Sequence, residues 1–277
     1  MGRGFENRMR SPLLNFLSIV FAAFVVMTAG PGPALAEPEP THWEVGAGAV
    51  VRPDYEGSED YEFVPVGTFR VNLEREAFVE FTGAKGSGRA AQLRVNVVSD
   101  ALVQFGPVLG FRFGRNDVDN DQVDAMNKVD SAVELGGFFG FDEQGWFGGI
   151  TVLADISDSY TGVFADGTLG YRYSFPWVTV GGNAVITWGS DGYMETYFGV
   201  GSDDSDRSGL EEYEADSDFK DVGAELFARV AIPGIEGLGL QGMFAYNRLI
   251  KDAADSPIVD VGSENQLFGG LMLVYGR

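Results

Sequence analysis

Residues 101–114 read ALVQFGPVLGFRFG, and every second residue from Ala101 onward is apolar. The residues between them include the polar side chains of Gln104 and Arg112. Side chains of a β-strand point to opposite faces in turn, so this stretch predicts a strand with one apolar and one more polar wall. It is much longer than the roughly five or six residues of an ordinary strand. Its length favours a tilted crossing of a lipid bilayer.

The same period of two recurs along most of the chain and predicts twelve strands. They lie at 43–51, 61–71, 75–82, 90–98, 101–114, 131–141, 146–156, 162–173, 177–188, 219–230, 237–249 and 265–275. An even number of long strands with one apolar wall predicts an all-β fold, a transmembrane antiparallel β-barrel of about 12 strands. A soluble barrel or sandwich is the structural alternative, but such folds generally use shorter strands.

The predicted connections alternate in length. If the first strand begins in the periplasm, the periplasmic connections are short, at 72–74, 99–100, 142–145, 174–176 and 231–236. The others are mostly longer, at 52–60, 83–89, 115–130, 157–161, 189–218 and 250–264. Outer-membrane barrels have short periplasmic turns and longer outer loops. The pattern therefore predicts a bacterial outer-membrane protein in contact with lipid and lipopolysaccharide.

Residues 1–36 are typical of a secretory signal peptide. A basic start that includes Arg3, Arg8 and Arg10 precedes a largely apolar run, and small residues flank a cleavage point after Ala36. A retained membrane anchor is the alternative, but the apolar run is shorter than the roughly 20 residues of a spanning helix. Translation from Met9 would leave a shorter signal and stays open. The expected division is a signal peptide, 1–36, and a barrel, 37–277.

Cleavage after Ala36 predicts Glu37 as the first residue of the exported protein. Signal peptidase reads small side chains just before the cleaved bond, and Ala34 and Ala36 occupy those positions. Mass spectrometry of protein purified from membranes should find this N-terminus. An intact start at Met1 or Met9 would show that the leader is retained.

Composition excludes several classes of function. The formal net charge is −22, which disfavours nucleic acid as a partner because phosphates need basic neutralisation. The chain has no cysteine and a single histidine, His42, which excludes thiol chemistry, histidine-based nucleophilic catalysis and ordinary zinc sites. We therefore expect no catalytic residues, no metal, no cofactor and no enzymatic activity.

Two acidic loops, near 117–121 and 203–206, are candidates for a calcium site. The first has aspartates at the spacing of a calcium loop. However, Gln122 stands where the turn needs glycine, and Lys128 stands where the bidentate glutamate belongs. A solvated acidic loop is the preferred interpretation, with weak binding of divalent cations at the lipopolysaccharide surface as the alternative.

Charged residues of both signs fall on the polar walls of the predicted strands. They include Arg94, Arg112, Arg172, Glu134, Asp166, Asp221, Glu225 and Arg229. Opposite charges attract strongly in a confined and partly dry space, so we expect ion pairs that obstruct the lumen. A small polar pore lined by the same residues is the alternative.

Three segments resemble the MipA/OmpV family of outer-membrane proteins: 45–58, 187–200 and 246–259. The residues that carry the resemblance at the predicted outer loops are Arg52, Pro53, Asp54, Tyr55, Glu56, Gly57, Tyr193, Tyr197, Phe198, Gly199, Asp255, Ser256 and Pro257. Proline and glycine turn the chain sharply. We expect these residues to fix the shapes of the loops rather than to hold a ligand.

The resemblance implies a non-enzymatic scaffold at the cell wall. One family member is described as joining a murein hydrolase, a lytic transglycosylase, to a murein synthase, a penicillin-binding protein. A narrow outer-membrane channel for small solutes is the alternative function. Short periplasmic turns count against the scaffold, and lumen charges of both signs count against a strongly selective pore.

Overall fold

The computed structural model describes residues 43–73, 77–85, 90–98 and 102–277. The predicted signal peptide lies outside these residues, as do the turn at 99–100 and parts of the connections at 72–74 and 83–89. No helix among the described residues combines the length and apolarity that a membrane span requires.

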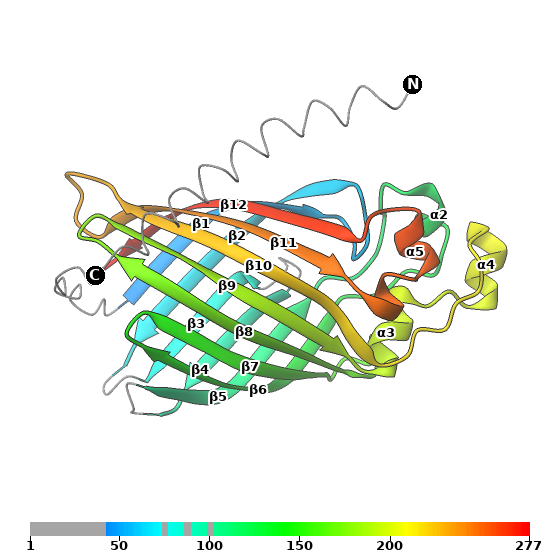
Figure 1. Ribbon diagram of the computed structural model, residues 1–277, viewed down its shortest axis with the longest axis horizontal. Coiled ribbons are helices and arrows are strands. Elements are labelled where there is room, and N and C mark those ends of the chain that lie inside the picture. Colours follow the sequence, from blue (N-terminus) through cyan, green and yellow to red (C-terminus); the bar gives the residue numbers. More distant parts are fainter. Residues whose placement is uncertain (1–42, 74–76, 86–89, 99–101) are drawn as a thin grey trace, which may run out of the picture. The chain divides into compact units, whose positions relative to one another are not determined.

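The described residues form twelve antiparallel strands that close into a barrel, which confirms the predicted fold (Figure 1). The strands are β1 (Trp43–Pro53), β2 (Tyr61–Asn72), β3 (Phe78–Lys85), β4 (Ala90–Asn96), β5 (Val103–Arg112), β6 (Ala132–Glu143), β7 (Trp146–Asp155), β8 (Val163–Ser174), β9 (Val178–Gly189), β10 (Asp218–Ala231), β11 (Leu238–Leu249) and β12 (Asn265–Gly276). Each strand pairs with its neighbours in sequence, and β1 closes the ring against β12. Each predicted strand overlaps an observed one.

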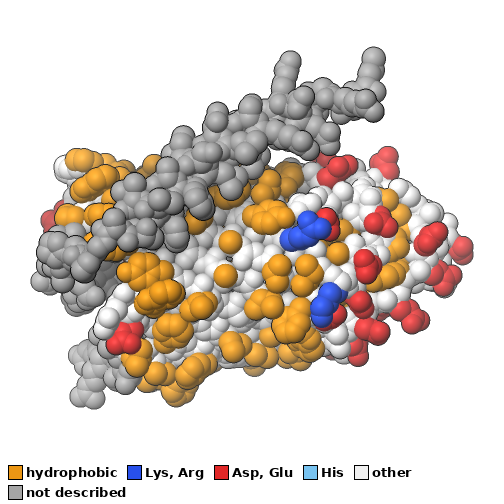
Figure 2. All heavy atoms as spheres, viewed as in Figure 1, with side chains coloured by type: hydrophobic (Ala, Val, Ile, Leu, Met, Phe, Trp, Pro, Cys, Tyr) orange, Lys and Arg blue, Asp and Glu red, His pale blue; other side chains and the backbone are white. Residues whose placement is uncertain are grey.

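Alternate side chains of β5 point to the outside and to the inside of the barrel. Leu109 and Phe111 point outward and are 45% and 41% exposed, whereas Val108 and Arg112 point inward and are buried. Figure 2 shows hydrophobic side chains gathered over the strands on one face of the molecule. Lipid would cover such a surface, because a monomeric soluble protein rarely exposes a continuous apolar patch of this extent.

The barrel has two different ends. At the inner end, which holds the barrel's first and last residues, Trp43 donates its backbone N–H to Arg277. Exposed aromatic pairs lie here, including Trp146 with Tyr171, whose ring centroids are 5.1 Å apart. Aromatic girdles of this kind mark the membrane interface. The outer end carries the long connections, and acidic side chains gather over it in Figure 2.

Replacing Leu109 by Arg is expected to destabilise the barrel by about 2–4 kcal/mol if the site lies near the bilayer midplane. Leu109 faces outward and lies beside Leu93 and Leu135 on the neighbouring strands, so the charge would enter hydrocarbon. Unfolding in lipid measures the loss. The matched control is Leu102→Arg, just before β5, where the cost should fall to about 0–1 kcal/mol. Equal stability of the parent and the Leu109 variant would contradict the outward assignment.

The long outer connections are more ordered than the sequence predicted. Their described residues form the short α-helices α2 (Asp121–Asp124), α3 (Asp191–Phe198), α4 (Ser202–Ser208) and α5 (Pro257–Asp260), and the 3-10 helix η2 (Lys251–Ala253). Asn120 and Ser256 cap α2 and α5 by accepting backbone N–H groups, which stabilises helices this short. The helices gather at one end of the barrel in Figure 1. We call this set of loops and helices the cap.

Candidate functional site

The three segments that carry the family resemblance meet at the outer end. Tyr193 of α3 donates its hydroxyl to Oε1 of Glu56, in the β1–β2 loop, at 2.8 Å. Ser256, the N-cap of α5, donates its hydroxyl to the backbone carbonyl of Phe198 at 2.6 Å. Segments whose contacting residues are 137 and 58 positions apart therefore fix one another's positions. That these residues shape the loops rather than hold a ligand stays a prediction.

The β1–β2 loop turns tightly at Gly57, whose φ of +101° is a conformation that side chains oppose. A Cβ added to Gly57 would lie 2.6 Å from Cγ2 of Val259, so the two loops also approach too closely for a larger residue. The backbone N–H of Gly57 donates to Oε1 of Gln266 at 3.1 Å. Glycine at this position therefore joins the first outer loop to the start of β12.

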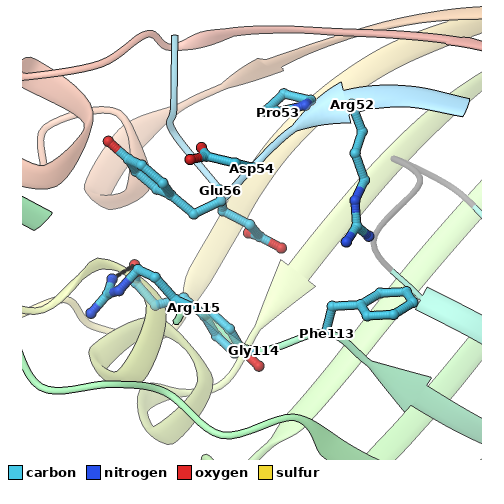
Figure 3. Close-up of a pocket in the computed structure, with 9 residues that line it drawn as sticks. Arg52, Pro53, Asp54, Glu56, Phe113, Gly114 and Arg115 are labelled. Atoms are coloured by element: carbon cyan, nitrogen blue, oxygen red, sulfur yellow. Dashed lines mark hydrogen bonds between the residues drawn. The ribbon is translucent and has the colours of Figure 1, made fainter. Parts of the chain in front are cut away.

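Figure 3 shows the small cavity between this loop and the end of β5. The guanidinium of Arg52 lies over the ring of Phe113, 4.2 Å from its centroid. Arg115 donates to the backbone carbonyl of Tyr197 at 3.1 Å. The cavity measures about 20 Å³, room for little more than one water molecule. The β1–β2 loop is therefore packed against the residues that follow β5, and the space between them is too small for a ligand.

The remaining motif residues also form contacts within the cap or mark the ends of its elements. Asp54 accepts the backbone N–H of Asp119 at 3.0 Å. Tyr55 is buried in an apolar cluster that includes Val123 and Ile258, and burial raises its pKa to about 12. Three further motif positions delimit a strand and two helices: Pro53 ends β1, Gly199 is the C-cap of α3, and Pro257 is the first residue of α5. Asp255 donates its backbone N–H to the carbonyl of Lys251.

Aromatic rings fill the outer mouth of the barrel. Tyr193 is fully buried, and its ring lies 4.7 Å from that of Tyr197, 5.2 Å from that of Tyr160 and 5.3 Å from that of Phe164 on β8. Burial raises the pKa values of Tyr160, Tyr193 and Tyr197 well above their usual range. The three hydroxyls are therefore neutral at physiological pH and can donate hydrogen bonds.

Buried charges surround these rings. Arg112 on β5 pairs with Glu134 on β6 at 2.6 Å, and Glu134 also accepts the hydroxyl of Tyr160 at 2.8 Å. Arg112 donates to the Tyr193 hydroxyl at 3.3 Å. A low dielectric strengthens such hydrogen bonds, and it also makes any unpaired member costly.

The charges continue to the other side of the ring. Lys220 on β10 pairs with Glu56 at 3.0 Å and with its neighbour Asp221. We call Arg112, Glu134, Tyr193, Glu56, Lys220 and Asp221 the mouth network; all six are buried. The mouth network therefore joins β5, β6 and β10 through the cap at the outer end of the barrel.

A larger cavity of about 640 Å³ lies inside the barrel, which we call the lumen cavity. Its arginines are held along the wall. Arg172 donates to Asp142 at 2.6 Å, Arg229 pairs with Glu44, and Arg94 donates to Thr151 at 2.8 Å.

This arrangement corrects the expectation that ion pairs obstruct the lumen. The pairs form with neighbouring or nearby strands and leave space at the centre, while the closure lies at the outer mouth. Of the predicted lumen charges, Asp166 and Glu225 also line the lumen cavity, whereas Glu134 and Asp221 belong to the mouth network.

Acidic side chains of the two acidic loops form hydrogen bonds and ion pairs within the cap. Asp204 accepts the N–H of Asn127 at 2.6 Å, and Lys128 pairs with Asp117. In the described part of the chain, no group of three or more histidine, cysteine or acidic side chains is arranged to hold a metal ion.

Lys220 is a member of the mouth network that the sequence did not reveal. The register between β9 and β10 shifts between Phe219 and Asp221, as at a β-bulge. A bulge adds one residue to a strand and interrupts the alternation. Lys220 and Asp221 are consequently both buried although they are adjacent. Tyr160 was also missed, because nothing in a short loop sequence indicates that its ring enters the barrel.

Comparison with known proteins gives a family and distant structural similarity. A family profile described as "MltA-interacting protein MipA" matches residues 45–276. The curated MltA-interacting protein of Escherichia coli K12 is 32% identical over 110 residues, which cover 40% of this chain and 43% of that protein. The chain therefore matches less than half the length of this relative.

Solved barrels resemble the chain in architecture. An outer membrane channel from Pseudomonas putida F1 is 13% identical, with a TM-score of 0.39, over 90% of this chain and 100% of that one. Pseudomonas aeruginosa OprD is 11% identical, with a TM-score of 0.36, over 87% of this chain and 68% of that one. Similarity this low supports no statement about activity.

Proposed function

We propose, since the chain belongs to the MipA family of outer-membrane proteins, that it is a closed barrel that holds a murein hydrolase and a murein synthase together without catalysing a reaction itself. The observation that carries this proposal is the closed outer mouth. Tyr193 and the buried charges around it occupy the opening that a diffusing solute would need.

A partner role also has support from the related protein's name. The Escherichia coli relative is called an MltA-interacting protein, and the shared segment covers 43% of it. A lytic transglycosylase is accordingly the first partner to test. The penicillin-binding protein rests on the family resemblance alone and is the second.

A periplasmic enzyme would have to contact the inner end of the barrel. The described inner turns include 144–145, 175–177 and 232–237, and the last of these exposes Ile235 and Glu236. Turns this short offer little surface. The contact we propose therefore includes the strand ends around them and buries a small area, as transient complexes do.

Site-specific photocrosslinking tests this contact in living cells. A photoreactive side chain at Glu236, in an inner turn, should capture a lytic transglycosylase. The same side chain at Asp206, exposed on α4 of the cap, is the matched control and should capture no periplasmic enzyme. Absence of both murein enzymes from the Glu236 product, with normal expression of the barrel, would refute the scaffold.

The lumen cavity favours a second candidate, the narrow channel for small solutes. A space of about 640 Å³ inside a barrel could hold a passing solute. Conduction would then require the cap to move away from the mouth.

The pure protein should show little or no steady ion conductance in a planar bilayer. The mouth network is buried and joins strands around the outer opening, so we expect it to obstruct the passage of ions. Single-channel recording measures this directly. Large, stable and reproducible steps from the parent protein would refute the closed barrel and support the channel.

A further inference from the structure

Glu225 is a carboxylate of the lumen cavity that lacks a partner. It lines the cavity, yet it makes no hydrogen bond or ion pair with any described residue. Other acidic groups of the cavity are engaged: Glu44, Glu80 and Asp142 each pair with an arginine. Asp166 is engaged as well.

Each arginine that lines the cavity already has an ion-pair or hydrogen-bond partner. Three of them form the pairs just named, Arg112 is held by Glu134, and Arg94 donates to Thr151. Five arginines and five carboxylates line the cavity, but Arg112 pairs with Glu134 outside that lining, so no described arginine of the lumen is left for Glu225. An unpaired charge in a partly dry space is costly. A cation that enters the cavity would offset this cost.

The surroundings of Glu225 suit a cation that also has an apolar part. Asn183 on β9 lies directly across from Glu225 and also lines the cavity, so its amide oxygen can accept from the same ligand. Phe227 lies two residues further along the same wall of β10, and its ring centroid is 6.1 Å from that of Phe147 on β7. Aromatic faces attract cations and cover apolar groups.

We propose that the lumen cavity binds a small organic cation, a primary ammonium group on a hydrophobic body. The ammonium lies between the carboxylate of Glu225 and the amide oxygen of Asn183. The hydrophobic body packs against Phe227 and Phe147. The cavity volume, about 640 Å³, lies within the roughly 300–1,000 Å³ usual for ligand pockets.

Entry is from the inner end. The mouth network closes the outer end, whereas the lumen cavity extends to Ser174 and Thr179, which flank the inner turn at 175–177. Binding of the amine depends only on the geometry of the lumen and is independent of any contact between the barrel and a murein enzyme.

Equilibrium dialysis of the refolded full barrel in a neutral detergent tests the proposal. The probe is phenethylamine, which is a cation at neutral pH and has an aromatic body. 2-Phenylethanol and 3-phenylpropionate are its neutral and anionic counterparts. We expect saturable binding of the amine and at least about tenfold weaker binding of the other two, since hydrogen bonds to charged groups are the stronger ones.

Two variants and one control assign the site. Glu225→Gln keeps the shape of the side chain and should weaken binding of the amine at least about tenfold. Asp206→Asn, which removes a carboxylate from the exposed surface of the cap, should leave binding unchanged. Phe227→Leu should weaken phenethylamine more than butylamine, because the aromatic contact matters only for the aromatic probe. This comparison of two ligands on one variant remains informative even if Glu225→Gln folds poorly.

Three results would overturn the proposal. One is the absence of saturable amine binding to the parent barrel. Another is equal affinity of Glu225→Gln and the parent for the amine. The third is binding of 3-phenylpropionate as tightly as phenethylamine, which would show that arginines and not Glu225 define the preferred ligand.

Discussion

Replacing Arg112 by Met is expected to lower the free energy of unfolding by about 3–5 kcal/mol, because it leaves the buried carboxylate of Glu134 without its cation. Both side chains are almost fully buried, and their atoms approach to 2.6 Å. Tyr193 also loses a hydrogen-bond donor. Denaturant unfolding of the barrel in lipid measures this loss.

Arg172→Met is the matched control for this prediction. Arg172 and Asp142 also form a close pair, but their side chains are 38% and 29% exposed, so water replaces the lost partner. We expect a loss of only about 0–1 kcal/mol there. Similar losses at both sites would show that the mouth network is not dry.

A double variant separates the cost of an orphaned charge from the value of the pair. Arg112→Met combined with Glu134→Met removes both charges. It should be less destabilising than Arg112→Met alone, because a buried pair is often replaceable by apolar side chains. A loss equal to the sum of the two single variants would indicate that the residues act independently.

Replacing Tyr193 by Ala should have the second large effect, a loss of about 3–5 kcal/mol together with the onset of ion conductance. The ring of Tyr193 is fully buried among two other tyrosines and Phe164. Its removal leaves a gap in the mouth network directly above the lumen cavity. Planar-bilayer recording of the variant should show small steps that the parent lacks.

Two controls separate closure of the mouth from general instability. Tyr246→Ala removes an outward-facing tyrosine on β11 and should leave the barrel silent. Tyr193→Phe keeps the ring but removes the hydroxyl that Glu56 accepts, so we expect a loss of about 1–3 kcal/mol without conductance. A silent Tyr193→Ala barrel that is correctly folded would show that other cap residues close the mouth.

The sequence by itself determined the barrel. Alternation is local information, since each residue's wall depends only on its position along the strand. Leu109 and Arg112 could therefore be assigned to opposite walls before their neighbours were known, and the structure places them so. The lengths of the connections likewise distinguished the end with short turns from the end with long loops.

Only the tertiary structure decided what the inward-facing residues do. The sequence placed charges on one wall, but the distances between those charges depend on which strands the closed ring brings together. Arg112 meets Glu134 because β5 and β6 are neighbours in register, and Lys220 turns inward because of a bulge. Folding of the loops into the cap brings Tyr193 to the mouth, where it meets buried charges, while a cavity of about 640 Å³ remains inside the barrel. Pairings of this kind join residues far apart in the chain, and no local pattern encodes them.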